Sequence, residues 1–137
     1  MRLVLAVLAI AVLAVAGFYG AVLLASESGE VVTLRTRAAE GGTHATRLWI
    51  VDHAGAEWVR TGHPGKGWFQ RTLAPPIVEL ERGGRTSTRV AVAVADPAVA
   101  EAVAGEFLSK YGIADRVVAL SGDAARRIPV RLDPAPP

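Results

Sequence analysis

The pattern of hydrophobic and polar positions changes abruptly near residue 26. Residues 3–25 form an unbroken run of apolar or small side chains. At about 1.5 Å per residue this run would make a helix about 35 Å long, which exceeds the roughly 30 Å hydrocarbon core of a bilayer. The sequence therefore predicts a transmembrane anchor in residues 1–25 and a separate domain in residues 26–137.

A cleaved signal peptide is the alternative interpretation of the N-terminal run. Such peptides have an apolar stretch of about 7–15 residues and a more basic start than the single Arg2 of this chain. The length therefore favours a retained, single-pass membrane helix. Because Arg2 and the α-amino group precede it, the favoured topology has the N-terminus inside and the domain on the extracytoplasmic side.

From Glu30 onward apolar and polar residues alternate, which is the pattern of half-buried strands. Short clusters of turn residues separate the first segments and can join them as antiparallel hairpins. The expected strands are residues 30–37, 44–51, 56–61, 76–82, 86–95 and 127–132, with a short helical turn at 68–73. This spacing is typical of a meander or small barrel, with a loose Pro-rich tail after Asp133.

One longer helix is expected after the fifth strand. Asp96 suits the N-cap position and Pro97 the first helical position, and Gly112 suits the C-terminal end. Between them an apolar stripe recurs at every fourth residue, at Val99, Val103, Phe107 and Tyr111. Such a stripe predicts that the helix packs on the sheet.

Strand parity separates two faces in the second strand, because side chains two residues apart share a face. Leu48 and Ile50 point one way, and Arg47 and Trp49 point the other. An apolar face can pack in the core, while an Arg-Trp face can hold a flat anionic ligand or a second subunit. A solvated face with an extended arginine is the alternative.

Composition narrows the possible chemistry. The chain contains no cysteine, which excludes disulfides, thiolate metal sites and cysteine nucleophiles. The three histidines lack the spacing of metal ligands, so no metal is predicted. Residues 35–89 hold nine basic against five acidic side chains, although the whole chain has a formal charge of only +2. This excess suits a small anionic ligand, and no nucleic-acid partner is expected.

The loop at residues 62–67, with the sequence GHPGKG, is the strongest local indication of ligand binding. Glycines expose backbone N–H groups, and Lys66 adds a charge suited to phosphate. The spacing differs from a P-loop, which has four residues before its Gly-Lys pair and Ser or Thr after it. A phosphate site and a plain glycine loop both remain open.

Residues 31–89 resemble the flavin-type split β-barrel family, in particular small deazaflavin-dependent nitroreductases and quinone reductases, and more distantly pyridoxamine-phosphate oxidases. The resemblance rests on VVTLRTR, THATRLWIVD, EWVRTGHPGKGWFQRTL and VELERGGR, taken in that order. It implies a mainly β fold with flanking helices: a six-stranded antiparallel split barrel, usually dimeric, here preceded by one transmembrane helix. The chain departs from the deazaflavin enzymes at residues 40–42 and 71–73.

The resemblance also implies a cofactor site for FMN or a deazaflavin coenzyme. By position, the residues expected to hold it are Arg47, Trp49, Arg60, Thr61, Gly62, Gly65, Lys66, Trp68 and Arg71. The cofactor ring carries the hydride chemistry in such proteins, so no catalytic acid or base is named.

The function implied is a membrane-anchored, homodimeric oxidoreductase that reduces small oxidised substrates such as quinones or nitro compounds. The alternative is a non-catalytic split-barrel module that binds haem, a lipid head group or a protein partner.

Overall fold

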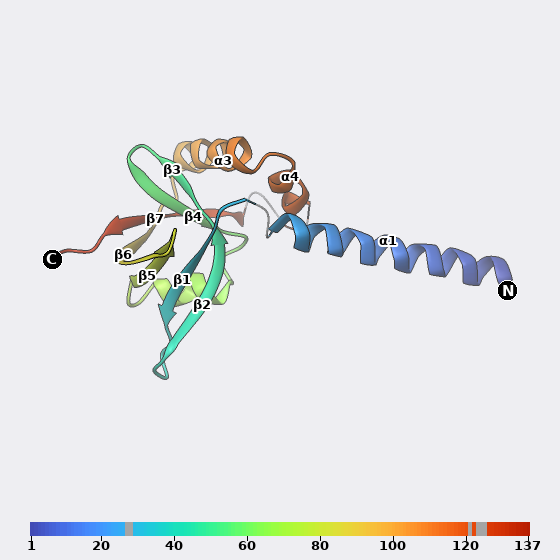
Figure 1. The fold of residues 1–137 in the computed structure, drawn as a ribbon, viewed down its shortest axis with the longest axis horizontal. Helices are drawn as coiled ribbons and strands as arrows, with labels where there is room; N and C mark the ends of the chain where they lie inside the picture. Colours follow the sequence, from blue (N-terminus) through green and yellow to red (C-terminus); the bar gives the residue numbers. More distant parts are fainter. Residues whose placement is uncertain (27–28, 121, 123–125) are drawn as a thin grey trace.

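The computed structural model describes residues 1–26, 29–120, 122 and 126–137. A long helix, α1 (Arg2–Ser26), projects away from a curled sheet that carries two further helices on one side, as Figure 1 shows. The domain is mainly β with flanking helices, as the sequence predicts.

The sheet contains seven strands rather than the six expected. They are β1 (Val31–Arg37), β2 (Thr43–Trp49), β3 (Val51–His53), β4 (Ala56–Thr61), β5 (Ile77–Arg82), β6 (Arg85–Ala93) and β7 (Ile128–Pro134). Their order is β2-β1-β5-β6-β7-β4-β3, and every neighbouring pair is antiparallel. The two outermost strands, β2 and β3, are consecutive in the chain, which curls the sheet into a barrel.

The additional strand arises because the predicted segment 44–51 is interrupted at Ile50. Residues before Ile50 pair with β1, whereas residues after it pair with β4. The backbone N–H of Ile50 donates to the Tyr111 hydroxyl at 3.1 Å, and its carbonyl accepts from the Lys110 ammonium at 2.8 Å. Side chains of a helix therefore replace the ladder hydrogen bonds where the strand changes partner.

The hairpin turn after Ile50 is tighter than expected. The predicted turn at 52–55 contracts to Ala54-Gly55, because Asp52 and His53 belong to β3. Ala54 has φ +51° and Gly55 φ +75°, and positive φ at both positions is the geometry of a two-residue hairpin turn. At the other end of the chain, β7 extends into the tail predicted to be loose, and Pro134 pairs with Arg89.

Two apolar clusters lie on opposite sides of the sheet. The inner cluster fills the barrel with residues that include Leu34, Ile50 and Trp68. The outer cluster lies under α3 (Pro97–Tyr111), where Phe107 and Tyr111 pack with Trp58 of β4. Predicted strand parity and the predicted helix stripe account for both clusters.

A further helix, α4 (Ile113–Ala119), was not predicted, because Gly112 was taken only as the end of the preceding helix. Gly112 has φ +55° and turns the chain so that a second helix begins at once. The short helix α2 (Gly67–Thr72) lies where the sequence predicts a helical turn, near residue 68.

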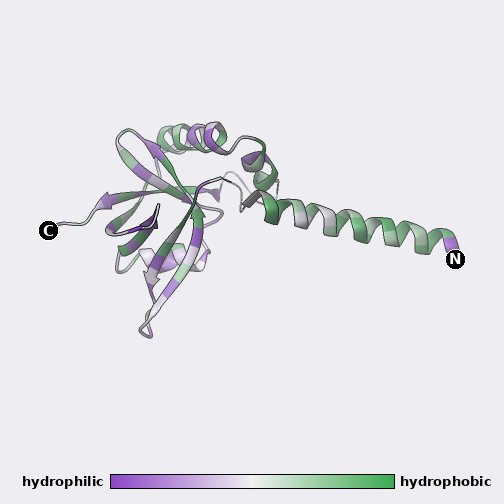
Figure 2. Cartoon of the chain, viewed as in Figure 1, coloured by the Kyte–Doolittle hydropathy of each residue, from purple (hydrophilic) through white to green (hydrophobic). Residues whose placement is uncertain are grey.

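α1 is long and apolar enough to cross a membrane, with a mean hydropathy of 2.6 over Arg2–Leu24, and none of that span is buried by the domain. Figure 2 shows that α1 is coloured as hydrophobic along most of its length, whereas hydrophobic and hydrophilic residues are mixed in the barrel. Its C-terminal end lies beside α4, against which it packs, as Figure 1 shows.

Candidate functional site

The loop after β4 is held in one conformation by its own polar groups. The Thr61 side chain is fully buried, and its hydroxyl donates to the His63 carbonyl at 2.5 Å and accepts from the His63 N–H at 3.3 Å. The His63 ring accepts the Gly65 N–H at 3.1 Å. The Gln70 amide donates to the Pro64 carbonyl at 2.6 Å. Residues 61–70 therefore form a preorganised loop that joins β4 to α2.

These bonds change what the loop offers to an anion. The Gly65 N–H is occupied by His63, and the Lys66 N–H donates to the His63 carbonyl at 3.2 Å. The exposed Lys66 side chain lies over Gly62, where a Cβ would be 3.7 Å from the lysine Cε. The N–H groups of Gly65 and Lys66 are thus engaged within the loop, and the exposed charge of Lys66 remains available to an anion.

A second cation lies against Gly67, at the end of the same loop. Arg71 of α2 donates from Nε to the Thr36 hydroxyl of β1 at 2.8 Å, which fixes the half-buried guanidinium. A Cβ built on Gly67 would lie 3.0 Å from Arg71 Nη1, so the arginine fits closely against the glycine. Lys66, whose side chain lies over Gly62, and Arg71, which lies against Gly67, are termed here the loop cations.

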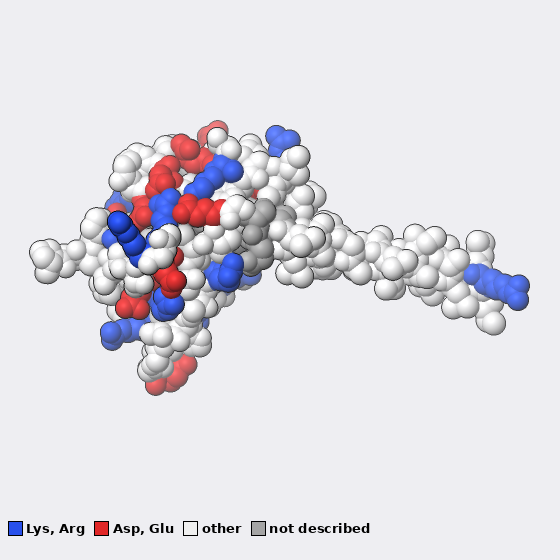
Figure 3. Space-filling model, viewed as in Figure 1, with Lys and Arg blue, Asp and Glu red and all other residues white. Residues whose placement is uncertain are grey.

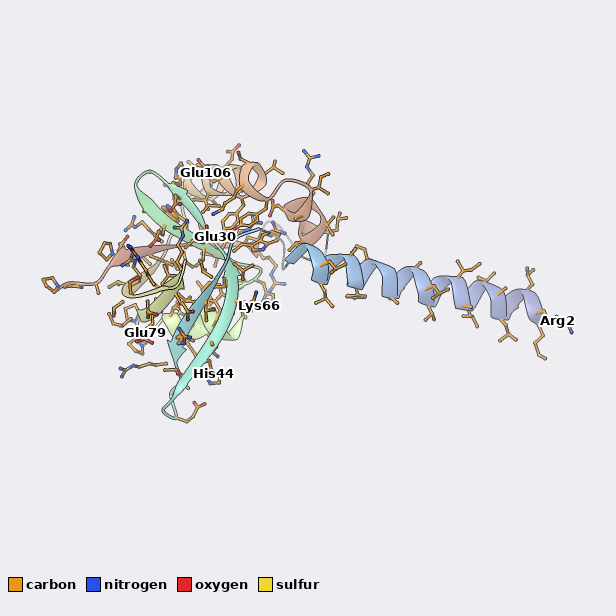
Figure 4. All side chains as sticks on the ribbon, in the orientation of Figure 1. Arg2, Glu30, His44, Lys66, Glu79 and Glu106 are labelled. Carbon is orange, nitrogen blue, oxygen red and sulfur yellow. The ribbon has the colours of Figure 1, made fainter. Side chains whose placement is uncertain are left out.

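The charges of the loop cations suit a phosphate group. One is a mobile point charge and the other a planar donor held in position, which is a common combination at phosphate sites. Figure 4 shows Lys66 on the barrel beside α2, well separated from Glu106 on α3. The geometry therefore suits a phosphate-bearing cofactor bound on this side of the barrel.

Other residues expected at the cofactor site lie elsewhere. Trp68 is buried in the inner core, with 5% of its surface exposed. Trp49 stacks on Tyr111 beneath α3, with ring centroids 4.3 Å apart. Arg60 points to the same side and forms an ion pair with Asp115 of α4. Arg47 is exposed on β2, opposite Thr33 of β1.

The expected site residues thus fall into separate groups. Thr61, Gly62, Gly65, Lys66 and Arg71 belong to the loop and α2. Trp49 and Arg60 belong to the region under α3. Sequence spacing could not distinguish these groups, because Arg60 and Thr61 are adjacent and point to opposite faces of β4.

A network of charged side chains was missed by sequence analysis. Arg82 makes two hydrogen bonds with Glu30 at 2.9 and 3.0 Å, two with Asp52 at 2.8 Å, and one with Glu57 at 2.9 Å. Lys110 also contacts Glu30, at 2.5 Å. Figure 3 shows acidic and basic side chains interleaved on this face.

This Arg82 network connects segments that are far apart in the chain. Hydrogen bonds from Arg82 lower the pKa of Glu30 and of Asp52. Glu30 precedes β1 directly, so the network attaches the segment after α1 to β3, β4 and β5. In the sequence, only the number of acidic residues and the position of charged residues near strand ends indicate such a network. Its dense internal pairing indicates a structural role.

Tyr111 also holds the segment at Glu30 in place. Its hydroxyl lies 2.7 Å from the Glu30 carbonyl and 2.9 Å from the Ile50 carbonyl, and one proton serves both. Burial raises the pKa of Tyr111, so the hydroxyl stays protonated at neutral pH.

Comparisons with known proteins bear on the fold. No protein-family model matches the sequence, and no curated protein matches it. Among solved structures, a conserved hypothetical protein of Mycobacterium tuberculosis is similar with a TM-score of 0.63 and 20% identity, over 80% of this chain and 75% of that one.

Two further solved structures have assigned roles. HutZ, the heme storage protein of Vibrio cholerae, has a TM-score of 0.56 and 16% identity, over 85% of this chain and 89% of its own. An F420-H2 dependent reductase has a TM-score of 0.56 and 17% identity, over 74% and 93%. These similarities confirm the split-barrel fold that the sequence resemblance implied.

Proposed function

We propose that this protein is a membrane-anchored oxidoreductase that binds FMN or a deazaflavin and reduces small oxidised substrates such as quinones or nitro compounds. The fold supports a protein of this kind, since one similar structure is a reductase dependent on F420-H2. The presence of two cations on one short loop and the helix after it, Lys66 over Gly62 and Arg71 against Gly67, is the observation that carries the proposal, because both charges suit a phosphate group.

In this proposal the chain's residues position the cofactor. Lys66 and Arg71 hold the phosphate, and the buried Thr61 hydroxyl keeps the loop in the conformation that presents Lys66. Thr36 orients Arg71 from the neighbouring strand. When bound, the flavin or deazaflavin ring supplies hydride transfer, and the protein contributes orientation and electrostatics.

The anchor proposal draws support from α4 as well as α1. α4 packs against the end of α1, and the side chains of Ile113 at its start and Leu120 just after its end are 78% and 75% exposed. Apolar side chains beside the end of a spanning helix would lie at the membrane surface, where their exposure to water is reduced. Residues 1–25 are thus proposed as the anchor and 26–137 as the extracytoplasmic barrel domain.

Dimerisation remains part of the proposal, but a different surface supports it. The Arg47-Trp49 face was expected to be partly apolar and open, but Tyr111 covers Trp49. Exposed apolar surface occurs instead at Leu73 and Ile77, which are 55% and 42% exposed near the start of β5. A second copy that covers these residues would lie close to α2 and the loop cations.

Absorbance and titration test the proposed function. The full-length protein, purified in mild detergent, is expected to carry or take up FMN or the deazaflavin F420, with saturable quenching of cofactor fluorescence. If neither cofactor binds and added haem gives a defined absorbance band, the oxidoreductase proposal is wrong and the binding-module alternative holds. If the protein binds none of the three, both fail.

A further inference from the structure

α3 does not fill the space between itself and the barrel. A cavity of about 90 Å³ lies there, and neither Lys66 nor Arg71 lines it. Three of its lining residues are one face of α3, at positions i, i+3 and i+4. The lining residues are Ala100, Val103 and Ala104 from the helix, and Arg60, Arg127 and Pro129 from the sheet side. Small alanine side chains on the helix leave this space open.

Two guanidinium groups line the cavity, and one is held rigidly. Arg60 has only 12% of its side chain exposed, forms an ion pair with Asp115, and lies 4.1 Å above the Phe107 ring. Arg127 stands at the start of β7 and lines the same cavity. Burial lowers the pKa of Arg60, and the charge of Arg127 opposes its protonation further. A bound anion would relieve this repulsion.

The charges indicate what kind of anion fits. At the cavity itself, the described charges are two arginines and one carboxylate, Asp115, which leaves a local formal charge of +1, and the Asp96 carboxylate lines the adjoining groove. A monoanion balances this charge, whereas a phosphate dianion exceeds it. The planar guanidinium also matches the geometry of a carboxylate.

The surroundings indicate what else the ligand carries. The cavity continues into a groove of about 390 Å³, with which it shares Ala100, Arg127 and Pro129. Val94, Ala95 and Ile128 give the groove apolar walls. Asp96 also lines it, but its carboxylate accepts N–H groups at the start of α3. The groove therefore suits a short apolar body.

We propose that the space under α3 binds a small carboxylic acid with an apolar tail. The carboxylate lies between Arg60 and Arg127, and the tail lies along the groove toward Pro97. This site is separate from the loop cations, and it does not depend on the proposed redox function.

Calorimetric titration of the full-length protein in detergent tests the proposal, with hexanoate as the probe. Hexanamide has the same tail without the charge, and acetate has the charge without the tail. Hexanoate is expected to bind at least about 10-fold more tightly than either, because a charge-assisted contact is worth roughly that factor or more. Equal affinity for hexanoate and hexanamide, or no binding of hexanoate, would overturn the proposal.

Variants locate the site. Arg127→Gln removes one cation without breaking the Arg60–Asp115 pair, and should weaken hexanoate binding roughly 10- to 100-fold. Ala104→Leu puts a larger side chain into the cavity lining and should weaken binding at least about 10-fold, whereas Ala102→Leu, also exposed on the same helix but outside the lining, should not. Retention of wild-type affinity by a folded Ala104→Leu protein would place the ligand elsewhere.

A competition experiment separates this site from the cofactor site. Hexanoate is expected to leave the affinity for FMN or the deazaflavin unchanged, and Lys66→Ala is expected to leave hexanoate binding unchanged. Displacement of the cofactor by hexanoate would show that Arg60 and Arg127 hold the cofactor instead, and would overturn the assignment of a separate carboxylate site.

Discussion

The Tyr111 hydroxyl lies within hydrogen-bonding distance of both backbone groups of Ile50, 3.1 Å from its nitrogen and 2.9 Å from its carbonyl oxygen. A single side chain on α3 thus satisfies the backbone at the residue where the bent strand leaves β1 and joins β4. The helix consequently stabilises the closure of the barrel as well as covering its outer face.

Replacement of Tyr111 by Phe is expected to lower the free energy of unfolding by about 1–3 kcal/mol, because it removes the hydrogen-bond partner of the buried Ile50 N–H. The ring stays in place, so stacking on Trp49 should persist. Chemical denaturation followed by tryptophan fluorescence measures the change. Tyr19→Phe, on the exposed α1, is the matched control and should be neutral. Equal stability of the two variants would contradict the role given to the hydroxyl.

Substitution of Gly29 by Ala is expected to be more damaging than the same change at Gly41. Both glycines have positive φ, +73° and +95°, so alanine at either position is expected to lower the free energy of unfolding by about 1–2 kcal/mol through backbone strain. Only at Gly29 would the new Cβ meet another group, at 2.8 Å from the Tyr111 ring. Thermal unfolding of the two variants isolates this close contact. A larger loss at Gly41 would show that the segment at Gly29 does not rest on Tyr111.

The Arg82 network predicts a loss of stability in acid. Hydrogen bonds from Arg82 lower the pKa of Glu30 and Asp52 below their ordinary values of 4.5 and 3.8. The stabilisation is therefore complete above those values and is lost as the pH falls through the lowered ones. Melting temperature should be nearly constant from about pH 7 to pH 5 and should fall below about pH 4.5.

Arg82→Gln tests the origin of that acid sensitivity. The variant should be less stable at neutral pH by about 1–3 kcal/mol, and its melting temperature should fall less on acidification. Arg85→Gln, at an exposed position just after the same turn, should keep the wild-type profile. A profile for Arg82→Gln parallel to that of the wild type would place the acid-sensitive carboxylates elsewhere.

Lys66→Ala should weaken the affinity for a phosphate-bearing cofactor by roughly 10- to 150-fold, the equivalent of one charge-assisted contact. Lys66→Glu should weaken it more, and both effects should shrink at high salt. Fluorescence titration of FMN and a deazaflavin at two salt concentrations measures this. Unchanged affinity in both variants would show that the loop is not part of the cofactor site. Lys66 would then be an ordinary exposed residue, whose replacement rarely changes stability by more than about 0.5 kcal/mol.

Deletion of residues 1–25 is expected to yield a folded, water-soluble domain, because no part of the Arg2–Leu24 span is buried by the barrel. The exposed Ile113 and Leu120, at the two ends of α4, should give the truncated domain weak affinity for lipid vesicles. Sedimentation with vesicles, before and after Ile113→Ser and Leu120→Ser, measures this affinity. Insolubility of the truncated protein in the absence of lipid would show that α1 also covers part of the domain.

The sequence alone was sufficient to predict the elements of the fold whose causes are local. The length of the apolar run marks α1, and alternation marks the strands, since each pattern reflects burial along one element. The N-cap at Asp96 and the stripe through Phe107 placed α3 within its observed bounds. Parity also placed Leu48 and Ile50 inside the barrel and Trp49 outside it.

Tertiary structure alone decided which partner each side chain meets. Nothing near Ile50 in the sequence shows that Tyr111, 61 residues away, would divide the strand. Arg60 looked like a phosphate ligand beside the loop, yet strand parity and the position of α4 turn it toward Asp115. The Arg82 network and the cavity under α3 likewise depend on contacts between distant segments. The physical reason is that patterns of hydrophobicity report burial, whereas hydrogen-bond partners and cavities depend on how elements pack together.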